Sequence, residues 1–363
     1  MPAVFRHQVA LLLVCFSVSL FAQDNGSTAP PTPPPRRSDP HPQADRHVTL
    51  DVVVTDKAGH PIPGLQQSDF TLLDDKQPQP ITSFRAVEET SATADPPLQV
   101  ILLIDAVNTA YQGVVYQRNE LIKFLQRDNG HLALPMSLFL LSDTSTQIQP
   151  TPSRDGNALV SALNANESGL RIIGRSQGFY GGADRVQISI KALEQLIAFE
   201  SKQPGRKLLV WLSPGWPLLS GPNVQMTEKG RESIFKTVVG LSTALREARI
   251  TLYSVDPAGM SDAGSMRTFY YESFLKGVPS ANKVDNGNLG LQVLAVQSGG
   301  RVLNSSNDVA RLIATCMDDS KAFYTLTFDS PRADHPDEYH SLQIQIGKPK
   351  LTARTRTGYY AQP

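Results

Sequence analysis

The fold class follows from one segment, Val100-Ile101-Leu102-Leu103-Ile104-Asp105, at residues 100–105. An unbroken apolar run leaves this segment without a polar face, which is typical of a parallel strand that is buried on both sides of a sheet. The segment ends at a carboxylate, Asp105. Because the ligands of such sheets bind at the carboxyl ends of the strands, Asp105 marks the expected binding edge.

Strands and helices alternate around this segment. Apolar residues with helical spacing predict helices at 114–127, 157–163, 186–199, 232–248, 291–297 and 309–317. Apolar, β-branched runs predict further strands at 137–141, 208–212, 250–255 and 301–303. The alternation predicts an α/β domain over residues 97–318, with a doubly wound, mostly parallel sheet of the Rossmann type.

The two ends of the chain alternate polar and apolar residues with period two. This pattern predicts strands at 48–56, 70–73, 81–84, 322–328, 341–346 and 352–355. The strands of residues 47–90 are too few to close a sandwich alone. We expect them to pair with the strands of residues 319–363 in one small β-sandwich, into which the α/β domain is inserted. Two separate β extensions are the alternative.

The N-terminal residues predict export. An apolar run at 9–22 follows Arg6 and ends at the small residue Ala22, which is typical of a cleaved signal peptide over residues 1–22. A membrane anchor is the alternative, but spanning a bilayer takes about 20 apolar residues. Residues 23–46 are rich in Pro and polar residues and predict a disordered linker. We therefore expect a secreted or periplasmic protein that does not span the membrane after cleavage.

Charge and cysteine content narrow the function classes. Lys plus Arg and Asp plus Glu number 34 each, so no basic field attracts a nucleic acid, and none is expected as a partner. After removal of residues 1–22, Cys316 is the remaining thiol, so the fold depends on its core and not on disulfides. Cys316 itself lies on an apolar helical stretch and is expected in the core.

Several enzyme and metal motifs are incomplete. Ser213-Pro214-Gly215 lacks the Gly-x-Ser-x-Gly elbow of a serine hydrolase. The glycine-rich segment 178–182 lacks the Lys and Ser/Thr of a P-loop and predicts a mobile loop. The segment 335–340 gathers metal-capable side chains, but Pro336 and the spacing of its histidines predict a solvated turn between two strands.

Short motifs in a fixed order cover nearly all of the chain after residue 46. They are Val52-Val53-Val54-Thr55-Asp56 with Gly59, Gly64-Leu65 with Ser68-Asp69-Phe70, Gln79-Pro80-Ile81 with Phe84, Leu103-Ile104-Asp105, and Ala353-Arg354 with Gly358-Tyr359. In this order they resemble the signal-bearing von Willebrand factor A-related proteins of the acidobacterial type. The resemblance implies a von Willebrand A-like α/β domain and an adhesion-type function.

The resemblance also implies a metal-ion-dependent adhesion site. Such a site holds Mg²⁺ through an Asp-x-Ser-x-Ser loop, a Thr and an Asp, all of which are oxygen ligands. In the first loop Asp105 and Thr109 match, whereas Val107 offers no oxygen. Ala183 stands in place of the Thr, and Ser213-Pro214-Gly215 in place of an Asp-Gly pair. The site is therefore degenerate.

Two side chains are candidates to replace the lost ligands, namely Asn108 and Asp184. Without a near-complete ligand set we expect weak or absent Mg²⁺ binding and no other cofactor. Asp105 is then expected to accept hydrogen bonds from backbone amides of its own loop. Asp105 and Thr109 remain the named metal candidates.

Three loops meet at the expected carboxyl edge, at 105–111, 174–185 and 213–220. Exposed aromatic residues anchor many interfaces, and Tyr111, Tyr116, Tyr180 and Trp216 lie in or near these loops. We predict a non-catalytic protein that binds a protein or cell-surface polymer through Asp105, Asn108, Thr109, Asp184, Ser213, Trp216 and Tyr180. The alternatives are an exported enzyme with Asp105 and Asp256 as its acid/base pair, or a structural subunit of an envelope assembly.

Overall fold

The central sheet is built around β5 (Gln99–Asp105), whose residues are all buried. Our computed structural model describes residues 46–88, 98–165, 178–219, 226–257 and 271–363. The other strands of the sheet are β6 (His131–Leu141), β7 (Thr146–Ile148), β8 (Ser153–Asp155), β9 (Lys207–Leu212), β10 (Ile250–Val255) and β11 (Val302–Leu303). The sheet order is β11-β10-β9-β5-β6-β7, with β8 also beside β6. The first five strands of this order are parallel, and β7 and β8 are antiparallel to β6.

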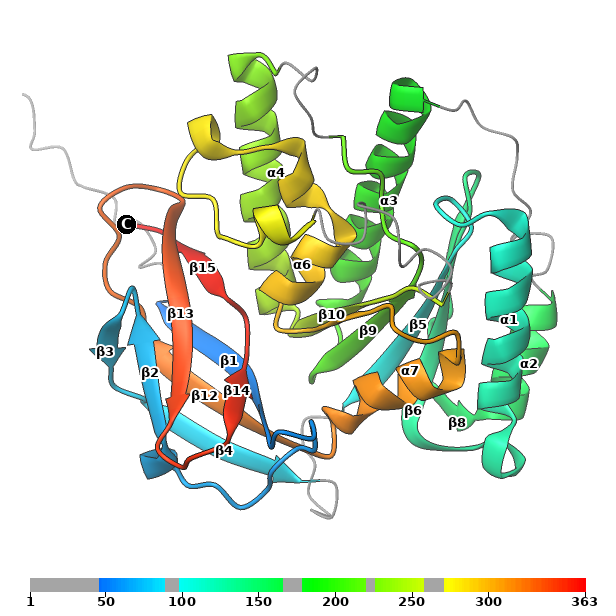
Figure 1. Cartoon of the computed structure of the whole chain (residues 1–363), viewed down its shortest axis with the longest axis horizontal. Helices are drawn as coiled ribbons and strands as arrows, with labels where there is room; N and C mark the ends of the chain where they lie inside the picture. Colours follow the sequence, from blue (N-terminus) through cyan, green and yellow to red (C-terminus); the bar gives the residue numbers. More distant parts are fainter. Residues whose placement is uncertain (1–45, 89–97, 166–177, 220–225, 258–270) are drawn as a thin grey trace, which may run out of the picture. The chain divides into compact units, whose positions relative to one another are not determined.

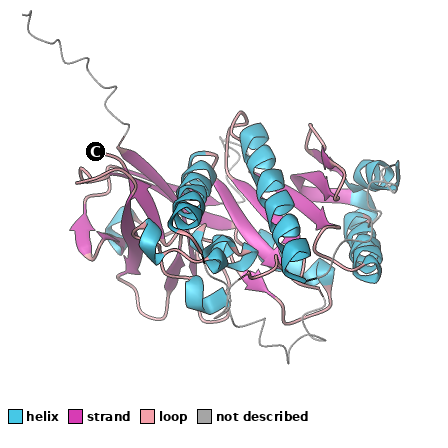
Figure 2. Ribbon diagram, turned by 90° about the horizontal axis from the view of Figure 1, so that it is seen from above, coloured by secondary structure: helices cyan, strands magenta, loops and turns pink. Residues whose placement is uncertain are grey.

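Helices cover both faces of this sheet (Figures 1 and 2). One face carries α1 (Tyr111–Leu125), α2 (Gly156–Ala165) and α7 (Val309–Asp318), and the other carries α3 (Gly178–Glu200), α4 (Glu228–Glu247) and α6 (Leu291–Gln297). Because side chains alternate along a strand, β5 sends Ile101 and Leu103 into one core and Leu102 into the other. The structure therefore confirms the expected α/β fold class.

The ends of the chain pair with each other in two antiparallel sheets. In the first sheet β12 (Ala322–Asp329) lies between β1 (His47–Thr55) and β4 (Ser83–Glu88), and β14 (Thr352–Arg354) also pairs with β1. The second sheet has the order β15 (Gly358–Ala361), β13 (Glu338–Ile346), β2 (Phe70–Asp74), β3 (Gln77–Gln79). Both sheets contribute to one apolar core, in which Phe70 contacts Phe84 and Tyr324. The exact domain boundaries remain a prediction.

Polar contacts join these antiparallel sheets to the central one. Arg354 of β14 donates a 2.5 Å hydrogen bond to the buried Asp319, which follows α7, and Tyr253 of β10 donates a second at 2.5 Å. Arg249 donates to Asp51 of β1 at 2.5 Å. A buried charged group without a partner is costly in free energy. These pairs therefore hold the strands of the chain ends against the central sheet.

Two helices begin at least four residues earlier than their apolar spacing predicts. α4 begins at Glu228 because Thr227 caps it, accepting a 3.1 Å hydrogen bond from the N–H of Gly230. α3 begins at Gly178, so the loop predicted at 178–182 is wrong. Gly182 lies against Leu219, where a Cβ atom would come within 3.0 Å of a methyl group, and this close packing favours glycine inside the helix.

Cys316 is fully buried and unpaired, as predicted. Short 3₁₀ helices lie at Gln67–Asp69, Arg127–Gly130, Tyr271–Phe274, Ala281–Lys283 and Asn286–Leu289. In the part of the chain that the structure describes, every helix is too short or too polar to cross a bilayer. The predicted signal peptide at 1–22 lies outside the described residues, as does nearly all of the predicted linker at 23–46.

Candidate functional site

Asp105 lies at the carboxyl end of β5 and is fully buried. Its Oδ1 atom accepts hydrogen bonds of 2.9 Å from the backbone N–H groups of Val107 and Asn108. Its Oδ2 atom accepts from Nδ2 of Asn108 at 2.8 Å and from the indole N–H of Trp211 at 2.9 Å. A carboxylate offers about four acceptor sites, so the described donors occupy the full capacity of Asp105.

The electrostatics of Asp105 reflect this environment. Burial raises the pKa of the Asp105 carboxyl, while the hydrogen bonds from Asn108 and Trp211 act against the rise. As expected for an aspartate that caps its own loop, Asp105 accepts from backbone amides of the turn that follows. The side chain therefore points into the protein and holds the loop after β5 in place.

Trp211 lies in the strand predicted at 208–212, but it was not among the predicted site residues. Trp211 lies in β9, next to β5, where it pairs in register with Leu103. Its ring is fully buried, so its N–H group needs an acceptor, and Asp105 is that acceptor. A tryptophan inside an otherwise aliphatic buried strand was the signal that could have revealed this pair.

Asn108 contacts Asp105 directly, and Thr109 follows it in the same loop. Nδ2 of Asn108 also donates to Oγ of Ser189 at 2.8 Å, which links the loop after β5 to α3. Oδ1 of Asn108 and Oγ1 of Thr109 are buried, and among the described residues neither has a hydrogen-bond partner. These two neutral oxygens are the unsatisfied acceptors near Asp105.

The other predicted residues of the site differ in their surroundings. Ser213 is fully buried beside Asp105, where its hydrogen bond helps to lower the pKa of that carboxyl, and it accepts a 3.1 Å hydrogen bond from the N–H of Gly215. Asp184 lies exposed on α3, and Ala183 beside it is partly buried. Asp184 therefore faces solvent, while Asp105 is enclosed.

These residues do not fit a Mg²⁺ ion. Such an ion needs about six oxygen ligands, with carboxylate oxygens among them. Asp105 has given its acceptor capacity to nitrogen donors, and Val107 and Ala183 contribute no side-chain oxygen. The unsatisfied oxygens of Asn108 and Thr109 are neutral and cannot replace a carboxylate.

The predicted exposure of Trp216 is wrong. Trp216 is 1% exposed and packs edge-on against Trp211, with ring centroids 5.2 Å apart. Gly215 has a φ of +98°, which turns the chain so that the next ring is directed into the core. This positive φ favours glycine, and a Cβ atom here would also displace the side-chain end of Gln292. A partner cannot reach Trp216 in this conformation.

Exposed aromatic residues lie instead on two helix N-termini. Tyr111 and Tyr116 of α1 are 63% and 41% exposed, and Tyr180 of α3 is 82% exposed. With Val115 they form the full set of exposed large hydrophobic side chains among the described residues. α1 follows the parallel strand β5 and α3 precedes the parallel strand β9, so both helices begin at the carboxyl edge of the sheet. We call Tyr111, Tyr116 and Tyr180 the aromatic rim.

Asp256 does not form an acid/base pair with Asp105. Asp256 follows β10 and is partly buried, and β9 lies between β10 and β5. Two inter-strand spacings separate the two backbones by about 10 Å. The Asp105 carboxylate also points toward Trp211. The structure therefore does not bring these two carboxylates together.

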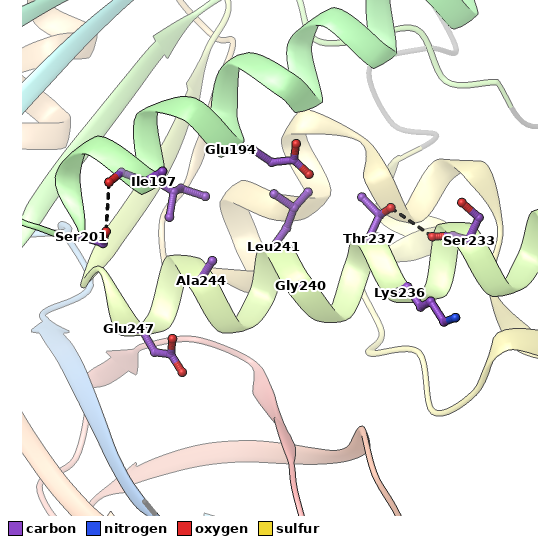
Figure 3. A pocket seen from close by; sticks show the side chains of 11 residues that line it. Glu194, Ile197, Ser201, Ser233, Lys236, Thr237, Gly240, Leu241, Ala244 and Glu247 are labelled. Atoms are coloured by element: carbon purple, nitrogen blue, oxygen red, sulfur yellow. Dashed lines mark hydrogen bonds between the residues drawn. The ribbon is translucent and has the colours of Figure 1, made fainter. Parts of the chain in front are cut away.

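A groove of about 630 Å³ lies elsewhere, between α3 and α4 (Figure 3). Ile197 and Leu241 point toward each other between the helices, whereas Lys236 and Glu247 point away from the space between them. Ser201, which follows α3, and Thr237 of α4 line the groove, but each donates its hydroxyl to a nearby backbone carbonyl, of Ala198 and Ser233 respectively. The centre of the groove is thus apolar, and the hydroxyl groups of Ser201 and Thr237 are engaged in hydrogen bonds to backbone carbonyls.

No family model matches this chain, and no curated protein sequence matches it. Solved structures give distant matches. A mutant of the PilB minor pilin from Streptococcus sanguinis has 11% identity, a TM-score of 0.32, and coverage of 74% of this chain and 77% of its own. The manganese-loaded TRAP protein of Plasmodium vivax has 12% identity and a TM-score of 0.31, and the match covers 80% of this chain and 99% of the TRAP chain. The pilus adhesin SpaC of Lactobacillus rhamnosus GG has 10% identity and a TM-score of 0.34, and the match covers 83% of this chain and 49% of the SpaC chain. At these scores the matches assign neither a fold family nor a function.

Proposed function

We propose that this chain is an exported, non-catalytic binding protein that contacts a protein or a cell-surface polymer through the carboxyl edge of a von Willebrand A-like, doubly wound sheet. The observation that carries this proposal is the aromatic rim. Tyr111, Tyr116 and Tyr180 expose large apolar rings at the edge where ligands of such sheets bind. Aromatic side chains bury much area at low entropic cost, and they anchor many interfaces.

The von Willebrand A-like assignment is supported by two kinds of observation. The ordered motifs around Asp105 resemble that family. The mostly parallel sheet with helices on both faces is an architecture that such a domain requires. Asp105 occupies the end of the strand where the adhesion-site aspartate is expected.

The proposed binding does not depend on a tightly held metal ion. Asp105 is engaged by Val107, Asn108 and Trp211, and this engagement orders the loop that leads into α1. The first residue of α1 is Tyr111. Asp105 thus acts as a positioning residue for the aromatic rim, and the rim makes the contact.

Binding of the labelled protein to envelope fragments of its own host tests this proposal. We expect a variant with Tyr111→Ser and Tyr180→Ser to bind at least tenfold more weakly, because both exposed rings are lost. The control is a variant with Lys202→Ser and Glu247→Ser, two exposed residues at the opposite edge of the sheet, where α3 and α4 end. We expect the control to bind like the wild type, and EDTA to have no effect.

Two results would contradict the proposal. Equal binding by the tyrosine variant and the control would show that the aromatic rim is not the contact surface. A loss of binding in EDTA that leaves the fold intact would show that a metal ion takes part.

A further inference from the structure

A second cluster of polar side chains lies at the turn between β2 and β3. Asp74 ends β2, and Asp75 and Lys76 form a two-residue turn in which both have positive φ, 45° and 68°, as a type I′ hairpin turn requires. His340 comes from β13, the strand that pairs with β2. Asp74, Asp75 and His340 place one ligand-type atom each within 4.8 Å of one another.

Each carboxylate of this cluster is anchored by one oxygen and presents the other to the same ring nitrogen. Oδ2 of Asp74 accepts a 2.7 Å hydrogen bond from the hydroxyl of Tyr359, and its Oδ1 lies 2.9 Å from Nδ1 of His340. Oδ1 of Asp75 accepts from both the backbone N–H and the hydroxyl of Ser341 at 2.8 Å. Oδ2 of Asp75 lies 3.6 Å from Nδ1 of His340. The two carboxylates are therefore oriented before any ligand arrives.

The cluster holds more negative than positive charge. Asp74 is almost fully buried and the imidazole of His340 is 9% exposed, while Oε1 of Glu338 lies 4.0 Å from Nε2. Asp74 and Asp75 both form an ion pair with His340. Among the described residues, neither of them pairs with a lysine or an arginine. Buried carboxylates are normally paired with cations or coordinate metals. One imidazole beside three carboxylates leaves room for a further cation.

The imidazole also has an unsatisfied atom. Nε2 of His340 is buried and, among the described residues, has no hydrogen-bond partner. If Nδ1 binds a metal ion, the ring proton resides on Nε2 and faces Glu338. A carboxylate behind the distal nitrogen is the usual arrangement for a metal-bound histidine. A small movement of Glu338 then satisfies the atom that lacks a partner.

We propose that Asp74, Asp75 and His340 bind a divalent transition metal ion of the Zn²⁺ type, with water in the fourth position. Tetrahedral ligands at the bond lengths of Zn²⁺ lie roughly 3.3 Å from one another. The distances of 2.9 Å and 3.6 Å from Nδ1 to the two carboxylates lie on either side of that value. The Asp75 side chain is 53% exposed, so the fourth position is open to solvent.

The types of side chain in this cluster also favour one class of metal ion. One imidazole and two carboxylates suit Zn²⁺ and similar transition ions, whereas Mg²⁺ and Ca²⁺ require more oxygen ligands. A bound ion would connect the β2–β3 turn to β13 and so clamp an N-terminal strand to a C-terminal one. Its binding free energy would then add to the stability of the antiparallel sheets.

Calorimetric titration of the chelator-treated protein with ZnCl₂ tests this proposal. We expect the wild type to bind one Zn²⁺ and to unfold at a higher temperature when Zn²⁺ is present. Asp75→Asn keeps an oxygen for the Ser341 donors and removes a ligand charge. This variant should bind Zn²⁺ at least tenfold more weakly while its metal-free melting temperature stays unchanged. His340→Gln should lose the site.

The matched control is His335→Gln, which removes an exposed histidine only five positions from His340. It should bind Zn²⁺ like the wild type. A Zn²⁺-soaked crystal should show an anomalous peak about 2.0–2.2 Å from the three ligand atoms. A wild type that takes up no Zn²⁺ would show that the cluster is an internal hydrogen-bond network only. Undiminished binding by both Asp75→Asn and His340→Gln would place the metal elsewhere, and either result overturns the proposal.

Discussion

The indole N–H of Trp211 donates a 2.9 Å hydrogen bond to Oδ2 of Asp105, across the boundary between β9 and β5. This pair explains why the aspartate of the carboxyl edge is directed inward. The indole supplies the fourth donor to a carboxylate that already accepts three hydrogen bonds from Val107 and Asn108. A carboxylate that is satisfied within the protein acts as a structural anchor for its loop.

Replacing Asp105 by Asn should destabilise the protein. The new NH₂ group must face two N–H donors on one side of the carboxyl position, which leaves buried donors without an acceptor. We expect a loss of about 1–3 kcal/mol in the free energy of unfolding, measured by urea titration. Asp184→Asn, at an exposed position of α3, is the control and should change stability by less than about 0.5 kcal/mol. An Asp105→Asn variant as stable as the control would contradict the anchoring role.

Titration with MgCl₂ or MnCl₂ should give no saturable heat from the Asp105 site. The measurement is best made in the Asp75→Asn background, so that the cluster around His340 does not contribute. The reason is that Asp105 has no acceptor capacity left and that its neighbours Asn108 and Thr109 offer neutral oxygens. Saturable binding that Asp105→Ala abolishes would refute this expectation and restore the metal-dependent adhesion site.

Trp216 and Tyr180 should respond to mutation in opposite ways. Trp216→Ala removes a fully buried ring that packs on Trp211 and should cost about 3–5 kcal/mol of stability. Tyr180→Ala removes a ring that is 82% exposed and should leave the free energy of unfolding within about 0.5 kcal/mol of the wild type. Thermal and urea unfolding measure both. A neutral Trp216→Ala would show that the ring is not part of the core.

Stability should fall at alkaline pH. Burial raises the pKa of Tyr253, and the neighbouring Asp319 raises it further. Burial likewise raises the pKa of Tyr359 and Tyr360. Below pH 10 both the folded and the unfolded chain keep these protons. Above pH 10 the unfolded chain ionises while the folded chain does not, so each tyrosine removes about 1.4 kcal/mol of stability per pH unit.

Urea titrations between pH 9 and pH 11 measure this loss. The difference between the wild type and Tyr253→Phe isolates one hydroxyl from other titrating groups, among them Lys207. The variant should lose stability less steeply with pH than the wild type does. Identical slopes would mean that Tyr253 ionises in the folded protein as easily as in the unfolded chain.

Local sequence patterns predicted most helices and strands, because the side chains that a helix or strand buries recur along the sequence with the period of that element. The apolar run before Asp105 became a central strand, and the alternating strands near both ends became antiparallel sheets. Errors arose where a tertiary contact competes with local preference. The glycines around Gly182 indicate a loop, but they lie in α3, where Gly182 packs closely against Leu219. Pro336 lies in a turn, as predicted, but the turn is shorter than expected, because β13 begins at Glu338 and buries His340.

The sequence by itself determined the order of strands and helices, the apolar faces that form the cores, and the identity of the side chains available at the carboxyl edge. Only the tertiary structure decided the partners of those side chains. Trp211 is 106 positions from Asp105, and His340 is 266 positions from Asp74. Hydrogen bonds and metal-type clusters depend on distances of a few ångströms between such residues. Those distances are set by strand pairing and core packing, which short sequence motifs do not encode.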